Sequence, residues 1–240
     1  MRTLVSLIIV SVCSGETEAN KARIIQGQLN VELSENGKRQ AERLRNYHRR
    51  NDIKFDLVFS SDLDRAIDTC RAIIGHSLDI VVDSRLRERA FGVIEGQSID
   101  KFRDEARRAG HSEENYSAFT PSGAETLTQV NNRVKDFCHN HLLRVVKPGF
   151  NVLIVTHGGV IREFMRFFRD NLHCYFSERE PLKVTPNTGV NLFKIEYSCD
   201  RLLKAICLKL HETSHLDDPT TAVVENEVSS RMAEVTYQSL

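Results

Sequence analysis

The apolar positions of this chain fall into short runs that alternate with amphipathic stretches. Runs short enough for single strands occur at 4–12, 55–59, 80–82 and 151–155. Between them, apolar residues recur at helical spacing among charged ones over 35–50, 62–74, 101–109, 125–146 and 160–171. Two later apolar runs, 189–197 and 202–210, predict a strand pair that turns near 198–200. This alternation predicts an α/β fold, in which a mainly parallel sheet carries helices on both faces.

The N-terminal apolar run has two interpretations. Arg2, followed by the apolar stretch 4–12 and by small residues up to Gly15, has the outline of a short signal peptide. It has equally the outline of a buried parallel strand that ends at a glycine-containing turn. The strand-and-helix alternation of the remaining chain favours the strand. We therefore expect a cytoplasmic protein, with secretion as the alternative if residues 1–14 act as a signal.

Composition excludes several classes of partner. The 240 residues include 33 Lys and Arg against 33 Asp and Glu, which gives zero formal net charge. Such a balance offers no electrostatic basis for binding nucleic acid or an anionic membrane. No apolar run reaches the length of a membrane span. The six cysteines are scattered and lack the close pairing of zinc or redox motifs, which favours a reduced, intracellular protein without a metal.

The chain is expected to form a single domain with a tail. Residues 1–210 carry the strand and helix patterns, and their number suits one compact domain. From 211 to 240, Thr, Ser, Asp and Glu dominate and periodic apolar spacing is sparse. Such a segment buries too little apolar surface to offset its ordering entropy, so we predict a disordered C-terminal tail.

Polar residues follow three of the predicted strands. In an open α/β sheet, ligands bind beyond the carboxyl ends of the strands, where helix N-termini direct their amides outward. Arg65 in the first turn of a helix, after a predicted N-cap at Asp62, and His157 at a strand-to-helix turn suit a phosphate group. The guanidinium binds phosphate in a bidentate manner, and the helix terminus adds partial positive charge. Each residue also has a structural interpretation, because Arg65 can pair with a carboxylate of its own helix and His157 can cap one.

The loop over 85–96 adds a candidate acid. Glu88 lies in this loop between Arg87 and Arg89. A carboxyl group held near a leaving oxygen can act as a general acid. The two arginines favour its ionised form, so an acid role requires burial or a bound phosphate. Arg65, Arg87, Arg89 and His157 together predict a locally positive cleft suited to a small anionic metabolite.

Taken in order, these motifs resemble the histidine phosphatase (phosphoglycerate mutase-like) superfamily. The motifs are Ser14-Gly15-Glu16-Thr17 with Asn20, Ile25-Gln26-Gly27-Gln28, Leu33-Ser34-Glu35-Asn36-Gly37, Ser60-Ser61-Asp62-Leu63-Asp64-Arg65, Leu86 to Gly92, and Thr156-His157-Gly158. Two further segments, Phe119 to Leu127 and Val184 to Gly189, are similar to the branch that hydrolyses fructose 2,6-bisphosphate and so regulates glycolysis. The resemblance covers about residues 4–210 and implies a three-layer, phosphoglycerate mutase-like fold.

The resemblance also implies roles for particular residues. In the family, a histidine just before the Gly-Glu-Thr segment attacks the phosphoryl group, and water then hydrolyses the phosphohistidine. By position, Arg65 would hold the phosphate, His157 would stabilise transition-state charge and Glu88 would donate the proton. The remaining residues implied to contact substrate phosphate are Glu16, Thr17, Asn20, Gln26, Gly27 and Gly158. The implied activity is phosphomonoester hydrolysis of a small phosphorylated metabolite, with neither a metal nor an organic cofactor.

The chain departs from the family where the nucleophile belongs. Cys13-Ser14 stands in place of the Arg-His pair. Ser14 has no evident base, and Cys13 aligns with the arginine, so the chain as written is predicted to be impaired or inactive. Three explanations remain open: a mispredicted or alternative first exon, a pseudoenzyme that binds phosphorylated sugars or a protein partner, and a secreted, cleaved derivative. An interaction protein without a phosphate site is a further alternative, and nothing indicates the oligomeric state.

Overall fold

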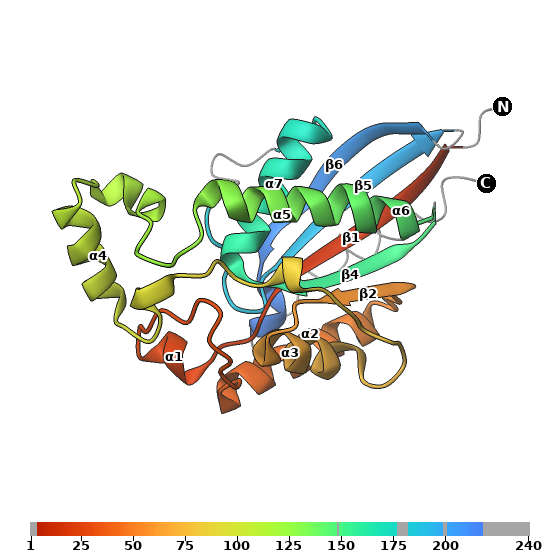
Figure 1. Ribbon diagram of the computed structural model, residues 1–240. Coiled ribbons are helices and arrows are strands. Elements are labelled where there is room, and N and C mark those ends of the chain that lie inside the picture. Colours follow the sequence, from red (N-terminus) through yellow and green to blue (C-terminus); the bar gives the residue numbers. More distant parts are fainter. Residues whose placement is uncertain (1–3, 148, 177–181, 199–200, 218–240) are drawn as a thin grey trace.

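One mixed sheet organises the protein. The computed structural model describes residues 4–147, 149–176, 182–198 and 201–217 (Figure 1). Within them, six strands pair in the order β3-β2-β4-β1-β5-β6. Their bounds are β1 Leu4–Cys13, β2 Leu57–Ser60, β3 Val81–Val82, β4 Asn151–Thr156, β5 Val190–Ser198 and β6 Arg201–Glu212. β1 to β4 are mutually parallel, and β5 alone runs in the opposite direction, antiparallel to both β1 and β6, which confirms the predicted mainly parallel sheet.

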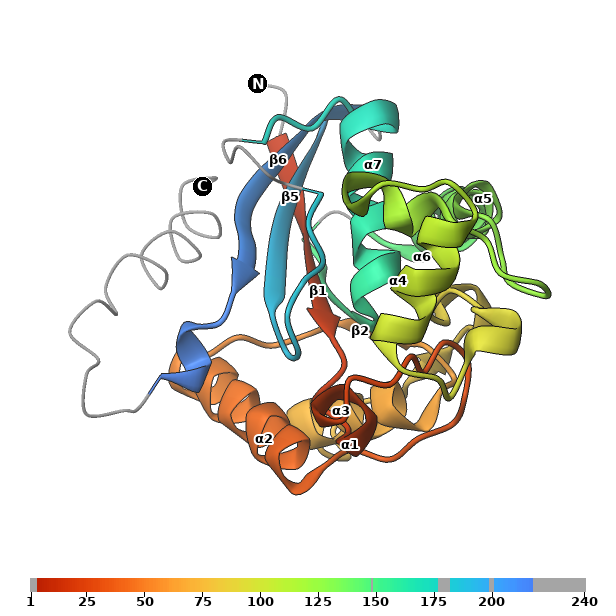
Figure 2. The same cartoon turned by 90° about the vertical axis from the view of Figure 1, so that its left-hand side faces the viewer.

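Helices cover both faces of this sheet, as predicted. One face carries α2 (Glu35–Arg50) and α3 (Asp64–Ile74), and the other carries α5 (Leu127–Phe137), α6 (Leu143–Val145) and α7 (Gly158–Asn171) (Figures 1 and 2). Strand alternation sorts the core between the two layers. In β1, Leu7 and Ile9 pack with the α5–α7 side, whereas Ile8, Val10 and Val12 pack with the α2–α3 side. The three-layer architecture follows from this alternation.

The N-terminal apolar run forms the central strand, which confirms the strand interpretation. β1 lies between β4, its parallel partner, and β5, its antiparallel partner. Leu7, Ile9 and Val12 are fully buried. A strand that is covered on both faces and paired on both edges needs an almost continuous apolar sequence. β1 therefore places the residues that follow it, from Ser14 onward, near the middle of the sheet at the carboxyl ends of its parallel strands.

The predicted helix over 125–146 is interrupted. α5 ends at Phe137, a π-helical turn spans Cys138–Leu142, and α6 follows. Phe137 and Leu142 are five residues apart and both are buried, a spacing that π-helical geometry places on one face. Five shorter elements in the described residues were not predicted from the apolar pattern: α1 (Glu18–Lys21) and the 3-10 turns Ser84–Leu86, Gly92–Ile94, Glu113–Ala118 and Ser214–Leu216. The helix predicted over 101–109 corresponds to α4, which spans Ile99–Arg108.

The predicted domain boundary at residue 210 falls inside a strand. β6 continues to Glu212, and the 3-10 turn at Ser214–Leu216 packs against α2. His215 in this turn is buried. Residues 211–217 therefore belong to the fold, because Glu212 pairs with Val190 of β5 and the His215 side chain is buried. Residues 218–240 of the predicted tail lie outside the described part of the chain.

Candidate active site

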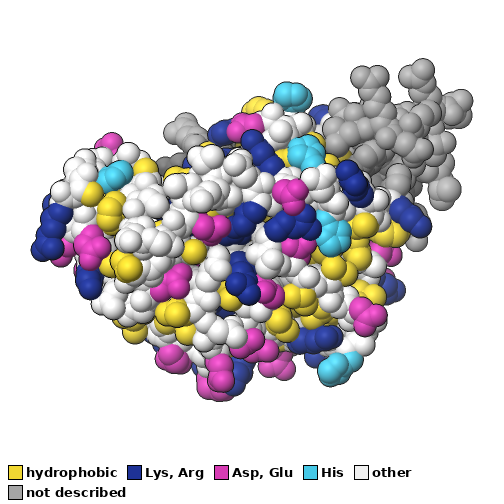
Figure 3. All heavy atoms as spheres, in the orientation of Figure 1, with side chains coloured by type: hydrophobic (Ala, Val, Ile, Leu, Met, Phe, Trp, Pro, Cys, Tyr) yellow, Lys and Arg dark blue, Asp and Glu magenta, His cyan; other side chains and the backbone are white. Residues whose placement is uncertain are grey.

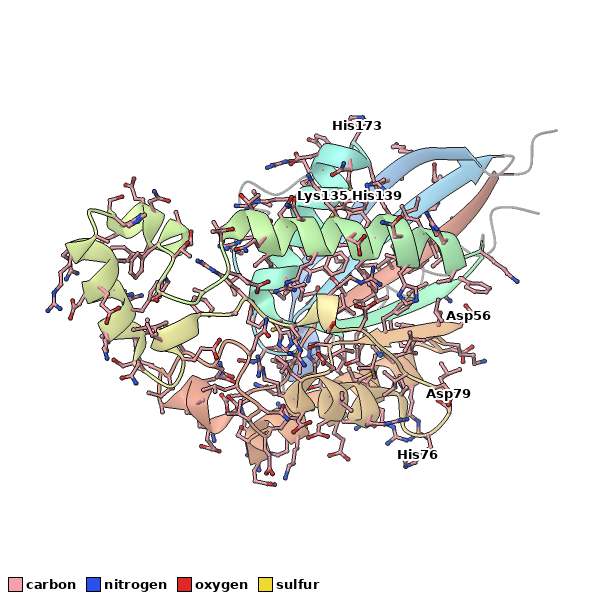
Figure 4. All side chains as sticks on the ribbon, in the orientation of Figure 1. Asp56, His76, Asp79, Lys135, His139 and His173 are labelled. Carbon is pink, nitrogen blue, oxygen red and sulfur yellow. The ribbon has the colours of Figure 1, made fainter. Side chains whose placement is uncertain are left out.

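The carboxyl ends of β1, β2 and β4 bring the three predicted motifs together. The Ser14 N–H donates to the Thr156 carbonyl at 2.8 Å, and the Ser61 N–H donates to the Val155 carbonyl at 3.0 Å. His157 follows Thr156 directly, and α3 and α7 begin at the same edge (Figure 1). Asp56, His76 and Asp79 lie together at the opposite edge, where β2 and β3 begin (Figure 4). The candidate phosphate residues thus share one end of the sheet.

Backbone carbonyls hold Arg65 in place. Its guanidinium donates to the Leu29 carbonyl at 2.9 Å and to the Gly27 carbonyl at 2.8 Å, and the residue is only 3% exposed. Burial lowers its pKa, an effect opposed by Glu88, but an arginine keeps its charge. The predicted N-cap role of Asp62 is wrong: α3 begins at Asp64 after Leu63, and the Asp62 carboxylate pairs with Arg87 instead.

His157 is a buried, neutral imidazole. Its Nε2 lies 2.9 Å from Ser61 Oγ, and its side chain makes no capping bond to α7. Burial, reinforced by the charges of Arg65 and Arg133, holds the pKa of His157 well below its usual range. A bound phosphate dianion supplies negative charge at this position and so favours the protonated ring. The ring can therefore gain a proton as an anion binds.

Glu88 lies at the N-terminus of α7. Its Oε2 accepts a hydrogen bond from the Gly159 N–H at 3.1 Å, and its Oε1 accepts one from the Arg89 N–H at 2.7 Å. Gly159 permits this approach, because a Cβ there would overlap Glu88 Oε1. These two hydrogen bonds fix the carboxyl group next to the predicted His157-Gly158 pair, and its role as proton donor stays a prediction.

Cys13 occupies the middle of this cluster. Burial and the nearby Glu88 charge raise the pKa of the Cys13 thiol to about 12. Arg65, the Gly158 N–H and the Ser14 hydroxyl act in the opposite direction. Both Cys13 and Ser14 are almost fully buried. At neutral pH Cys13 is therefore a thiol, which is a far weaker nucleophile than a thiolate.

Several predicted contacts have structural partners. The Glu16 carboxylate accepts hydrogen bonds from Ser34 Oγ at 3.0 Å and Asn36 Nδ2 at 3.2 Å, and so ties the β1 exit to α2. Thr17 and Asn20 form the capping box that starts α1. The half-buried Glu16 carboxylate thus supports the local structure, and its contact with substrate phosphate stays a prediction. Substrate contact by Thr17 and Asn20 stays a prediction.

Gln26 and Gly27 lie on the loop that holds Arg65. Gly27 has φ +52°, a conformation that favours glycine, and its carbonyl accepts from Arg65. Gln26 Oε1 is buried without a hydrogen-bond partner in the described structure. An unpartnered buried oxygen is costly unless a ligand or water satisfies it. The side-chain oxygen of Gln26 can therefore accept a hydrogen bond from a ligand or water at the loop beside Arg65.

The predicted cationic cleft is smaller than the sequence suggested. Arg87 pairs with Asp62, at 2.7 and 2.6 Å. Arg89 is 5% exposed and donates to the carbonyls of Ser117, Phe119 and Glu125. Arg87 is paired with a carboxylate and Arg89 uses all three of its nitrogens, whereas Arg65 uses only its two terminal nitrogens. This corrects the expectation that Arg87 and Arg89 line the cleft. On the face in Figure 3, acidic and basic side chains are interspersed.

Arg162 on α7 is a candidate that the sequence interpretation missed. Its Nε is buried without a hydrogen-bond partner in the described residues, and Glu163 Oε1 is 3.8 Å away. Its charge acts on both Glu88 and Arg89, so it lies on their side of α7. The available signal was its spacing, four residues after Gly158, which puts both on one helix face. Arg162 extends the positive charge beyond Arg65.

Comparison with known proteins places this geometry in a family. The model of the histidine phosphatase superfamily (branch 1) matches residues 9–206. The chain belongs to the histidine phosphatase superfamily. Fructose-2,6-bisphosphatase TIGAR from Bos taurus is 35% identical over 236 residues, covering 76% of this chain and 86% of the relative. This histidine phosphatase therefore has a curated relative that matches most of its length.

Solved structures agree on the fold. Phosphoglycerate mutase from Bacillus anthracis has a TM-score of 0.72 at 24% identity, covering 90% of this histidine phosphatase and 96% of its own chain. A histidine-to-alanine mutant of a phosphoserine phosphatase from Entamoeba histolytica, in complex with phosphoserine, has a TM-score of 0.67 at 21% identity and covers 88% of this chain and all of its own. None of the helices in the described ranges is long and apolar enough to cross a membrane.

Proposed function

We propose that this protein binds a small phosphorylated metabolite at the carboxyl edge of its sheet, and that Cys13 and Ser14 strongly impair hydrolysis. The observation that carries the proposal is Arg65, a nearly fully buried guanidinium fixed by two carbonyls beside His157. No carboxylate of the described residues forms an ion pair with Arg65, although the charges of Glu88 and Glu95 act on it, and a buried cation of this kind suits an anionic ligand.

The surroundings of Arg65 add to its affinity for phosphate. The N-terminus of α7 supplies partial positive charge, and the Gly158 backbone N–H acts to lower the pKa of the Cys13 thiol. His157 is neutral when the site is empty and can take up a proton with the anion. Such electrostatic positioning is most of what phosphoryl binding and transfer require.

A second anionic group on the ligand accounts for Arg162. Its Nε makes no hydrogen bond within the described residues and lies 3.8 Å from the Glu163 carboxylate. It is on the Glu88 side of α7, so the positive charge of the site extends in that direction. We infer a bisphosphorylated sugar, and fructose 2,6-bisphosphate is the first candidate because TIGAR proteins acting on it are relatives of this chain.

Turnover is limited by chemistry and not by binding. The family reaction needs a histidine nucleophile, and Ser14 stands at that position. Cys13 cannot substitute, because its raised pKa keeps the thiol protonated. The absent arginine at position 13 removes a further electrostatic donor, a loss of about 3 kcal/mol of transition-state stabilisation. Phosphoserine bound to the histidine-to-alanine mutant of the amoebal phosphatase supports binding without a nucleophile.

The test separates binding from turnover. Calorimetry with fructose 2,6-bisphosphate and with inorganic phosphate measures affinity, and phosphate release measures hydrolysis. Three proteins are compared: the unchanged chain, the Cys13→Arg/Ser14→His variant and Arg65→Met. We expect binding without release by the unchanged chain, release by the double variant and neither by Arg65→Met. Equal release by the unchanged chain and the double variant would refute the impairment, and binding indifferent to Arg65 would refute the site.

A further inference from the structure

The turn before β5 clamps the end of β1. The Thr188 N–H donates to the Cys13 carbonyl at 3.1 Å and approaches the Ser14 carbonyl at 3.4 Å. Asn187 Nδ2 donates to the Ser14 carbonyl at 2.9 Å, and the Cys13 N–H donates to the Gly189 carbonyl at 3.2 Å. The two peptide groups that carry the candidate nucleophile position are thus oriented by residues 187–189.

Thr188 adopts an unfavourable backbone conformation in this turn. Its φ is +52°, in the left-handed region that β-branched residues rarely occupy, and its side chain is fully buried. Such a conformation persists only where the surrounding structure holds it in place, and it is common next to functional sites. The next question is therefore what holds Thr188.

His215 holds the Thr188 side chain from the far end of the described chain. Its Nε2 lies 3.0 Å from Thr188 Oγ1 and the bond is buried. The segment 213–217, which we term the C-terminal strap, is itself anchored: Arg43 of α2 donates to the Leu216 carbonyl at 2.7 Å. Figure 2 shows the strap where the end of β6 meets α2. The strap thereby links α2 to the β1 exit.

We propose that His215 is a positioning residue of the phosphate site, acting through Thr188 on the carbonyls of Cys13 and Ser14. The inference rests on the proposed function, because it concerns the same site. We term the hydrogen bond between His215 and Thr188 the Thr188 clamp. When the Thr188 clamp is in place, the 187–189 turn holds the carbonyl groups of Cys13 and Ser14 in a fixed orientation. When the clamp is lost, these oxygens can reorient beside the bound anion and weaken its binding.

Matched variants test the clamp. His215→Leu and Thr188→Val remove the hydrogen bond while keeping a buried side chain, and His215→Gln retains a group that can bond Thr188. His48→Leu is the control: His48 is equally buried and lines a small cavity together with His215, but its Nδ1 has no hydrogen-bond partner among the described residues. The readouts are calorimetric affinity for inorganic phosphate and the melting temperature.

The expected pattern distinguishes positioning from general stability. His215→Leu and Thr188→Val should weaken phosphate binding about threefold to tenfold, the effect of one hydrogen bond. His215→Gln should restore most of the affinity, and His48→Leu should keep it even where its melting temperature falls. Unchanged affinity in Thr188→Val, or an equal loss in His48→Leu, would overturn the proposal.

A second readout works without any ligand. The amide protons of Thr188 and Gly15 should exchange with solvent at least threefold faster in His215→Leu than in His48→Leu, measured by NMR. Absence of phosphate binding by the unchanged chain would refute the proposed function, and the exchange rates would still decide the clamp. Equal exchange rates in the two variants would refute it.

Discussion

Three buried histidines, His48, His157 and His215, make the folded protein sensitive to mild acid. His48 and His215 are 5% and 6% exposed. Burial, with a contribution from His215, lowers the pKa of His48 to about 3. Burial lowers the pKa of His215 to about 4, although Glu212 and Asp217 oppose the shift. Below the ordinary value of 6.5, the unfolded chain binds protons at these positions and the folded chain does not. The free energy of unfolding therefore has its highest value above pH 6.5 and decreases as the pH drops towards 4.

The size of the effect follows from the width of that window. At pH 5 each histidine lies about 1.5 pH units below its unfolded pKa, which corresponds to about 2 kcal/mol. His48 and His215 together remove about 4 kcal/mol, a large part of a typical stability of about 5–15 kcal/mol. His157 adds to this loss, because burial lowers its pKa as well. Carboxylates with lowered pKa, such as Asp62 and Asp83, act in the same direction, but only near and below their unfolded value of 3.8. The range between pH 7 and pH 5 therefore reports mainly on histidine.

Urea unfolding followed by circular dichroism at pH 7, 6 and 5 measures this dependence. His48→Gln and His215→Gln should each remove about 2 kcal/mol of the difference between pH 7 and pH 5, whatever their stability at pH 7. The exposed His139 supplies the control, because His139→Gln removes a histidine from the surface. An unfolding free energy that is the same at pH 7 and pH 5 would refute the reasoning, as would an unchanged dependence in both glutamine variants.

Three further predictions concern the site. Arg65→Met leaves the Gly27 and Leu29 carbonyls without their donors, so phosphate affinity should fall more than tenfold. Arg65→Lys should retain part of the affinity. If calorimetry gave Arg65→Lys the same affinity as the unchanged chain, bidentate binding would be contradicted. In the Cys13→Arg/Ser14→His protein, adding Gly159→Ala should change kcat by a larger factor than KM, and kcat should fall because the new methyl group displaces Glu88. An unchanged kcat would count against Glu88 as the acid. Cys13 has a pKa of about 12, so iodoacetamide at pH 8 should label it far more slowly in the folded than in the urea-unfolded chain by mass spectrometry. Rapid labelling of the folded protein would show that the thiol is accessible and ionised.

The sequence predicted the architecture well because strong periodicity leaves few choices. The helix predicted over 35–50 matches α2 in full, since Ser34 caps its start and apolar spacing runs through its length. The helix over 125–146 was predicted without its π-helical turn, because a single register change hardly alters the pattern. The boundary at 210 was wrong because the buried face of residues 211–217 consists of one histidine in an otherwise polar segment.

The candidate site was predictable in position but not in partners. Strand order and chain direction place Arg65, Glu88 and His157 at one edge, which pattern and resemblance anticipate. Whether an arginine faces a ligand or a carbonyl depends on loops that no periodicity specifies. Arg87 and Arg89 were therefore misjudged, and Arg162 was missed because its neighbours come from a distant loop. The strained Thr188 carries no sequence signal at all, since its conformation is imposed from outside.

The position of β1 at the centre of the sheet has a consequence for biosynthesis. The strand is translated well before its partners β4 and β5, since Ile8 pairs with Asn151 on one side and Lys194 on the other. This apolar strand therefore stays unpaired on both sides until most of the chain has been translated. Pairings this distant in sequence form slowly, and an unpaired apolar strand invites aggregation meanwhile. Production of this protein should therefore benefit from slow translation, low temperature or chaperones that shield the nascent N-terminus.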